Sequence, residues 1–384
     1  MNRLFRYSFS ALVAALLAAG CGGGGGSSNT TAAPTTPPPG ALQPGGSGAD
    51  LGQVADDQGN AVTVDFSNAL DINDNNQVVG FAAATAGASF KAALWAVDAQ
   101  GAATVTPTSL AALAGNTFSA AFSVANSGDA VGQSAKGAQL VAVIWKDGAA
   151  GPEELPALSA AGNSAAFGIS PDGSGIVGEA FDATTGTTRA VIWRVAADGA
   201  IAAPQVLPTN IFVKLTADGS LPVAFSSALR ISDAGVIVGE VEDGEGVLHA
   251  AVWEPGAGSA YTPFDLRNGG EEGSSALAIN GAGLVIGESE TSGGEFVPVY
   301  WSKDATGEYK RTELAAAGGA GGVNSAGRIA GWETSAAVDN AVVWNAPSLA
   351  KATLFTSSSQ AYAINDNNLV VGRKGSVGFI KLVE

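Results

Sequence analysis

The sequence has little cysteine, histidine or charge, and these shortages limit what the protein can do. Its 384 residues include one cysteine, one histidine and 14% charged residues. One cysteine cannot form an internal disulfide. A single histidine leaves almost no material for zinc sites or for Cys–His and Ser–His–Asp catalysis. After the N-terminus no apolar run approaches the roughly eighteen residues that a transmembrane helix needs.

The charge balance and the small residues narrow the class further. The formal net charge is −17, and a surface this acidic repels phosphate backbones, so we expect no nucleic-acid partner. Apolar surface comes mainly from Ala, Val, Ile and Leu rather than from aromatic residues, which are 7% of the chain. The 53 glycines indicate many tight turns, which favours an all-β fold.

The N-terminus has the pattern of a lipoprotein export signal. Arg3 and Arg6 precede an apolar stretch that ends in "LAAGC" at Cys21. This pattern resembles the lipobox of bacterial lipoproteins, although Leu17 stands one place earlier than is usual. The resemblance implies a signal peptide over residues 1–20, lipid attachment at Cys21 and contact with a membrane only through that anchor. An ordinary cleavage site followed by a stray thiol is the alternative.

A tether follows the predicted anchor, and the rest of the chain forms one domain. Residues 21–48 comprise the lipidated cysteine and a segment rich in Gly, Ser, Thr and Pro, whose composition predicts an extended linker. No Asp follows Cys21, and by resemblance to Gram-negative lipoproteins this implies the outer membrane. Residues 49–384 form the domain, which we expect to be a monomer at the periplasmic or outer surface.

One phrase occurs seven times in that domain. "ALDINDNNQVVG" at Ala69–Gly80 returns almost unchanged as "AYAINDNNLVVG" at Ala361–Gly372, and five looser copies lie between them. Each copy has Ile or Val followed four residues later by Gly or Asn, the residues that tolerate positive φ, so each copy predicts two strands joined by a tight turn. Paired apolar residues before the final Gly indicate that both faces of the second strand are buried.

Each copy is followed by further strand patterns. Six of the seven tryptophans occupy one position of a third strand, as in "KAALW" and "RAVIW", and predict side chains that fill the space between layers. Segments such as "YTPFDL" and "YKRTEL" predict a fourth, edge strand. The final glycines lie 41 to 61 residues apart, a length that suits four short strands. The repeat therefore predicts a seven-bladed β-propeller of four-stranded blades.

The last copy ends after its third strand, so another part of the chain must complete it. We expect an N-terminal strand over residues 61–67 to supply the missing outer strand and close the ring. The first and last copies would then be neighbours.

At these positions the sequence resembles the HAF-repeat family of presumed extracellular bacterial proteins, whose repeat looks like "A..IND.G.VVG......HAF.W". The resemblance covers about residues 65–383. Only His249 matches the histidine of the family, and Lys381 stands in the seventh Trp position. The resemblance implies an exported or surface protein and no particular activity.

Three acids form the main candidate site. Glu179, Glu240 and Glu288 directly follow the final Gly in three consecutive copies, so the fold would bring them to one side of the ring. Solvated strand ends are the plain interpretation, and a site for a cation or a basic partner is the functional one. Paired-carboxylate glycoside chemistry is a remote variant.

Three other features have plain and functional interpretations. "DINDNN" from Asp71 resembles the start of a calcium loop, but no acid stands twelve places along, and a tight turn explains the same residues. His249 occupies a slot filled by Lys, Val, Arg and Asn in the other copies, which favours a structural role. Residues 207–227 form an apolar insertion that either carries specificity or packs on the ring.

These features predict a lipid-anchored propeller of the cell envelope that acts as a non-catalytic binding or scaffold module. We expect no metal, no catalytic residues and no cofactor, with Ca²⁺ as the one ion to consider. The partner would be a protein or glycan. The alternative is a propeller enzyme that acts on glycans or peptides through carboxylates. The channel-side position before each Ile or Val favours the module, because five of its seven residues are small and uncharged; the two exceptions are Asp71 and Arg230.

Overall fold

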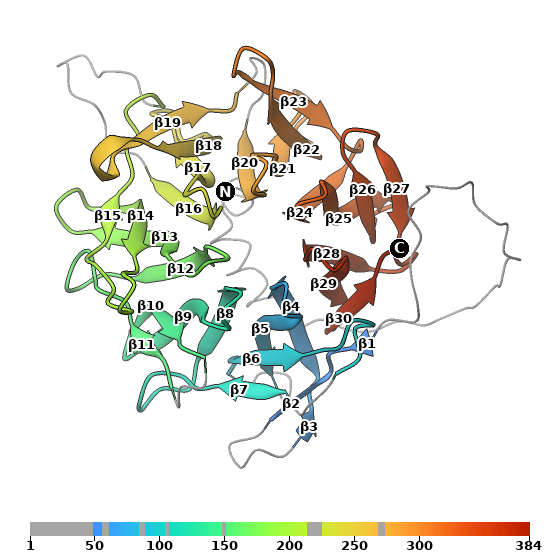
Figure 1. Cartoon of the computed structure of the whole chain (residues 1–384), viewed down its shortest axis with the longest axis horizontal. Helices are drawn as coiled ribbons and strands as arrows, with labels where there is room; N and C mark the ends of the chain where they lie inside the picture. Colours follow the sequence, from blue (N-terminus) through green and yellow to red (C-terminus); the bar gives the residue numbers. More distant parts are fainter. Residues whose placement is uncertain are drawn as a thin grey trace, which may run out of the picture.

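The domain is a ring of seven four-stranded antiparallel sheets (Figure 1). The computed structural model describes residues 49–55, 61–83, 89–103, 107–147, 151–212, 225–267 and 273–384. In each sheet the first strand of the repeat lies nearest the axis and the fourth lies at the rim. The chain is therefore a seven-bladed β-propeller, as the repeat predicts. The predicted signal peptide, Cys21 and the tether lie outside the described residues.

The blades follow one another in chain order, and their strands form four concentric layers. The innermost strands are β4 (Phe66–Ile72), β8 (Ser119–Val124), β12 (Ser164–Ile169), β16 (Ser226–Ile231), β20 (Ser274–Ile279), β24 (Gly318–Val323) and β28 (Ser359–Ile364). The second strands are β5 (Gln77–Ala83), β9 (Ala130–Lys136), β13 (Gly175–Asp182), β17 (Ile237–Glu242), β21 (Val285–Glu290), β25 (Arg328–Ser335) and β29 (Leu369–Lys374). The third strands are β6 (Lys91–Ala96), β10 (Gln139–Trp145), β14 (Thr187–Arg194), β18 (Leu248–Pro255), β22 (Phe296–Lys303), β26 (Val338–Asn345) and β30 (Val377–Leu382). The outer strands are β7 (Thr108–Leu110), β11 (Glu153–Glu154), β15 (Gln205–Val206), β19 (Tyr261–Asp265), β23 (Tyr309–Glu313), β27 (Ala350–Thr353) and β1 (Ala49–Asp50).

A hairpin of β2 (Gln53–Ala55) and β3 (Ala61–Thr63) precedes the first blade, and a short 3-10 turn, η1 (Ala257–Ser259), precedes β19. No helix in the described part of the chain is long and apolar enough to cross a membrane.

An N-terminal strand closes the ring, but it is not the segment expected from the sequence. β1 pairs with β30, with Ala49 opposite Ile380. The expected residues 61–67 instead form β3, which pairs with β2, and the start of β4. The alternation of "AVTVDFS" is shared between a hairpin and an inner strand, so the pattern indicates strand without indicating its partner.

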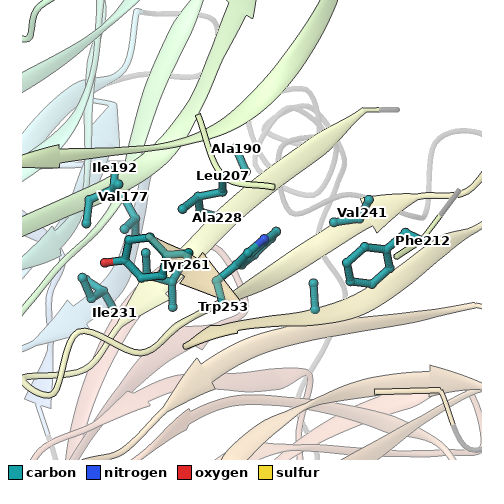
Figure 2. Packing of buried hydrophobic residues seen from close by; sticks show 12 residues of the cluster. Val177, Ala190, Ile192, Leu207, Phe212, Ala228, Ile231, Val241, Trp253 and Tyr261 are labelled. Atoms are coloured by element: carbon teal, nitrogen blue, oxygen red, sulfur yellow. The ribbon is translucent and has the colours of Figure 1, made fainter. Parts of the chain in front are cut away.

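The repeated tryptophans lie between blades, as predicted. Trp253 is fully buried at the junction of the third and fourth blades, with Ile192, Leu207 and Tyr261 in the same cluster (Figure 2). The indole N–H of Trp253 donates to the carbonyl oxygen of Pro208, in the preceding blade, at 2.7 Å. The indoles of Trp95, Trp145 and Trp193 make the same bond at 2.8 Å. For Trp95 the acceptor is Gln53, the third residue after β1 and the first of β2. This contact therefore lies at the seam, by which we mean the junction of the first and last blades.

A serine near the start of the innermost strand links most blades to the previous one. Its hydroxyl oxygen accepts the backbone N–H of the residue three places before the Trp position, for example Ser164 from Ala142 at 2.9 Å. Six of the seven junctions have this bond, including Ser67 to Gly378 across the seam. At the remaining junction Pro298 has no N–H to donate, and Gly318 stands in the serine position.

Candidate binding site at the axial cup

Residues from all seven blades line a cavity of about 260 Å³ on the ring axis, which we call the axial cup. Its walls come from the ends of the innermost strands and from the turns that join them to the second strands. Seven repeats of one turn therefore form one shared wall.

A β-bulge in every innermost strand shapes the cup. The register shifts at the same place in all seven blades, for example between Ala69 and Asp71 in β4. A bulge inserts one extra residue, so two successive side chains point to the same side of the strand. The bulge also explains the glycine that ends each copy: a Cβ on Gly80 would lie 1.8 Å from the carbonyl oxygen of Asn68.

The extra residues of these bulges include a buried apolar group from five blades. Five of them are large and apolar, and they belong to one buried cluster; we call them the apolar tier: Leu70, Phe122, Phe167, Leu229 and Leu277. In the last two blades the equivalent residues are Gly321 and Tyr362, which line the cup. Burial raises the pKa of Tyr362 to about 12, so its hydroxyl is neutral and donates to the side chain of Gln360. This tier was not predicted from the sequence, although its signal, a large residue two places before the Ile or Val, is present in six of the seven copies.

Asp71 lines the cup, and donors from the protein surround its carboxylate. One oxygen accepts the Ser123 hydroxyl at 2.6 Å and the Val124 N–H at 3.1 Å. The other accepts the N–H of Ile72 at 3.0 Å. Asp71 therefore links the first blade to the second at the wall of the cup.

Arg230 is the one basic residue among the described residues that line the cup. It is half-buried, and its Nη1 donates to the carbonyl oxygens of Phe167 at 2.6 Å and Leu229 at 3.0 Å. These bonds hold the side chain against the inner strands of the third and fourth blades. Asp71 and Arg230 occupy the position before the Ile or Val that the sequence predicts to face the channel, and both line the cup.

The rim of the cup consists of turn residues that bind the next turn. The Asn73 side chain donates to the carbonyl oxygen of Ala125 at 2.8 Å, and Asn280 donates to Asn324 at 2.9 Å. Asp74 accepts the N–H of Asp366 at 3.0 Å and the side chain of Asn126 at 3.1 Å. The "DINDNN" residues thus act as inter-blade hydrogen-bonding groups, which supports the turn interpretation over the calcium loop.

The three candidate acids lie at equivalent positions of strands β13, β17 and β21. Glu240 is fully buried and accepts the hydroxyl of Ser275 in the next blade at 2.8 Å, so the expectation of a solvated strand end is wrong for this residue. Glu288 lies opposite Ser275 in the same sheet, and burial raises the pKa of its carboxyl to about 7. Within the described ranges no group of three Asp, Glu, His or Cys side chains is arranged to hold a metal ion. A site for a cation or a basic partner at Glu179, Glu240 and Glu288 stays a prediction.

His249 lies away from the cup, in β18. It is buried, and its Nε2 is 2.9 Å from a carboxylate oxygen of Asp243 in the preceding turn. Arg267 approaches the same nitrogen at 3.3 Å. Burial opposes the ionisation of Asp243, but hydrogen bonds from His249 and from two backbone N–H groups together lower its pKa. This network fastens the turn between β17 and β18, as the structural interpretation predicts.

The insertion and one further cavity complete the candidates. Residues 207–212 and 225–227 of the insertion are described, and Leu207 and Phe212 are buried against the third and fourth blades; the remainder lies outside the described residues. A second cavity of about 480 Å³ lies between the fourth and fifth blades. Its polar groups bind one another, because Lys303 pairs with Glu254 and Tyr309 donates to Glu254 at 3.0 Å. The cup is the better candidate because every blade contributes to it.

Comparisons with known proteins show only distant structural likeness. No family model matches the chain, and no curated protein matches it. The structure is similar to that of TolB from Acinetobacter baumannii, with 9% identity, a TM-score of 0.42 and coverage of 72% of this chain and 62% of that one. It is also similar to the tricorn protease, with 11% identity, a TM-score of 0.41 and coverage of 83% and 30%. For Porphyromonas gingivalis dipeptidyl peptidase 4 the identity is 9%, the TM-score 0.37 and the coverage 75% and 37%. This chain thus spans less than two thirds of each of these three proteins, and likeness at this level carries no conclusion about activity.

Proposed function

We propose that this β-propeller is a non-catalytic binding module of the bacterial cell envelope that takes its ligand in the axial cup. A lipid on Cys21 would hold it at the outer membrane, with residues 22–48 as the spacer. The lipobox resemblance and the resemblance to HAF repeats support the location.

The proposal is based on a difference between the recurrent and the variable positions of the repeat. Its recurrent Trp, Ser and Asn residues make hydrogen bonds between blades, for example Trp193 to Pro156 and Asn324 to Asn365. The residues that differ between copies, Asp71 and Arg230 among them, line the cup. Recurrent positions therefore build the ring, and variable positions give the cup its own chemistry.

The acid–base groups of the cup support binding rather than catalysis. General base catalysis needs a base within hydrogen-bond reach of the substrate proton that it removes. Asp71 already accepts three hydrogen bonds from the protein, and Tyr362 is neutral. Glu240, the most deeply buried of the candidate acids, lies in a junction between two blades.

A two-part experiment tests the proposal. Membrane fractionation of cells that express the wild type and Cys21→Ala tests the anchor: the wild type should sediment with membranes, and the variant should be soluble or unprocessed. Thermal-shift screening of the purified protein against amino acids, sugars, organic acids and peptides tests the cup. Some class should raise the melting temperature and be recovered chemically unchanged. Equal partitioning of the two proteins would contradict the anchor, and conversion of the ligand would contradict the non-catalytic role.

A further inference from the structure

The axial cup carries opposite charges on opposite walls. Asp71 belongs to the first blade and Arg230 to the fourth, so two blades lie between them one way round the ring and three the other way (Figure 1). No ion pair joins the two residues: every bond of the Asp71 carboxylate goes to Ile72, Ser123 or Val124. The cup therefore has a basic side chain on one wall and an acidic side chain on another.

The remaining wall is small and apolar. Ala278, Gly322 and Ala363 occupy the same position in the fifth, sixth and seventh blades, and they leave the space between the charged walls open. Even alanine cannot replace Gly322 without a backbone shift, since a Cβ there would lie 2.7 Å from the Cα of Ala363. A cavity of about 260 Å³ lies just below the roughly 300–1,000 Å³ of ordinary ligand pockets, which suits a small molecule.

The charges of the rim restrict the ligand further. Three more carboxylates line the cup, on Asp74, Asp233 and Asp366. A simple carboxylate ligand would meet one arginine and four acids, and a simple amine would make no charge-assisted hydrogen bond to Arg230. A molecule with both groups can place its carboxylate at Arg230 and its ammonium near Asp71 and the acidic rim.

We propose that the axial cup binds a small zwitterion, a molecule that carries a carboxylate and an ammonium group on a short apolar skeleton, as free amino acids do. This inference rests on the proposed function and names the ligand class of the same site. Arg230 and Asp71 are the residues that discriminate, and the small wall residues set the size limit.

Three probes of similar shape separate the contributions of the two charges. L-Leucine carries both groups, 4-methylpentanoate only the carboxylate and 3-methylbutylamine only the ammonium. Calorimetric titration of the full chain should give a Kd for leucine that is at least about tenfold lower than for either single-charge probe, which corresponds to about 1.4 kcal/mol. Equal affinity for leucine and 4-methylpentanoate would overturn the proposal, and so would no binding of leucine at millimolar concentration.

Variants locate the site. Arg230→Gln should weaken leucine binding at least about tenfold, and Arg230→Lys should retain part of it because the charge remains. Arg267→Gln, an arginine outside the cup, is the matched control and should leave the affinity unchanged. If Arg230→Gln does not fold, the ranking of the three probes on the wild type still decides. Loss of leucine binding in the Arg267 variant, or full binding in Arg230→Gln, would contradict the site. Failure of all zwitterions while another class binds in the cup would overturn this inference and leave the proposed function standing.

Discussion

The side chain of Asn365 donates a hydrogen bond of 2.9 Å to the carbonyl oxygen of Asn73, 292 residues earlier in the chain. The same amide reaches the side-chain oxygen of Asn76 at 2.9 Å, and the neighbouring Asn367 also binds Asn76. These contacts join the two nearly identical sequence copies across the seam. Asn76 has a positive φ of 58°, and glycine has a positive φ at the equivalent position of five other copies. Unlike glycine, asparagine also supplies a side-chain acceptor for the facing turn.

The seam predicts unequal effects for two asparagines of one turn. Asn365 is buried, and Asn365→Ala removes both its bond to Asn73 and the acceptor of the buried Leu369 N–H. This substitution should lower the free energy of unfolding by about 1–3 kcal/mol. Asn367 is exposed, and water can replace its bonds, so Asn367→Ala should cost less than about 1 kcal/mol. Urea unfolding of both variants measures the difference. Equal losses would argue against a buried seam contact.

Closure by β1 predicts a sharp boundary for N-terminal truncation. Leu51 is buried against the first and last blades, and its burial alone is worth about 1.5–3 kcal/mol. A chain that starts at residue 56 should therefore melt well below one that starts at residue 49, because it also loses the pairing with β30 and the acceptor of Trp95. The chain that starts at 49 should melt like the chain that starts at 22. Calorimetry decides, and similar melting of the 49 and 56 chains would contradict closure by β1.

The serine hydrogen bonds between blades predict that removal of a single serine hydroxyl destabilises the ring. Ser164→Ala removes the acceptor of the buried Ala142 N–H and should cost about 1–3 kcal/mol in free energy of unfolding. Ser348→Ala, at an exposed serine, is the control and should change stability by less than about 0.5 kcal/mol. If chemical denaturation gives the same small change in the free energy of unfolding for both variants, the serine hydrogen bonds between blades do not stabilise the ring.

Glu288 predicts a pH dependence of known sign. Its pKa is raised from 4.5 to about 7 by burial, so the folded state holds a proton that the unfolded chain releases between these values. Stability should therefore fall as pH rises from about 4.5 to 7 and level off above that range.

Glu288→Gln should remove this dependence. The variant should match the wild type near pH 4 and be more stable near pH 8 by about 1–3 kcal/mol, since one pKa unit corresponds to about 1.4 kcal/mol and partial exposure screens the charge. Glu313→Gln, at an exposed strand end, is the control. A wild-type minus variant difference that does not change with pH would show that Glu288 ionises normally.

The sequence predicts the ring well because its signals are periodic. Seven turns, the position of the tryptophans and several outer strands follow from residue types that recur at fixed spacing. The partner of a strand is harder to predict: residues 61–67 alternate like an outer strand, yet β1, only two residues long, takes that place. Two-residue strands such as β1 and β11 carry no period, so only their partners identify them.

The candidate site was predicted less well for a related reason. Asp71 and Arg230 stand in a position that the repeat itself marks as channel-side, so the sequence identifies them. The β-bulge, which depends on the pairing of two strands, turns one further residue per blade toward the axis. Glu179, Glu240 and Glu288 share a sequence position, but the strand pairing places Glu240 in a blade junction. The shared sequence position predicts that the three acids occupy equivalent places in their strands, but it does not predict what surrounds each side chain.

Filling the axial cup is the most direct test of the claim that the ligand binds there. Ala278→Phe places a ring at the channel-side position of the fifth blade, and Ser302→Phe places one in the cavity between the fourth and fifth blades. Binding of L-leucine, or of whichever compound the screen identifies, is measured by calorimetric titration of both folded variants and the wild type. The account predicts that Ala278→Phe abolishes binding and Ser302→Phe leaves it unchanged. Full binding by Ala278→Phe, or its loss in Ser302→Phe alone, would contradict it.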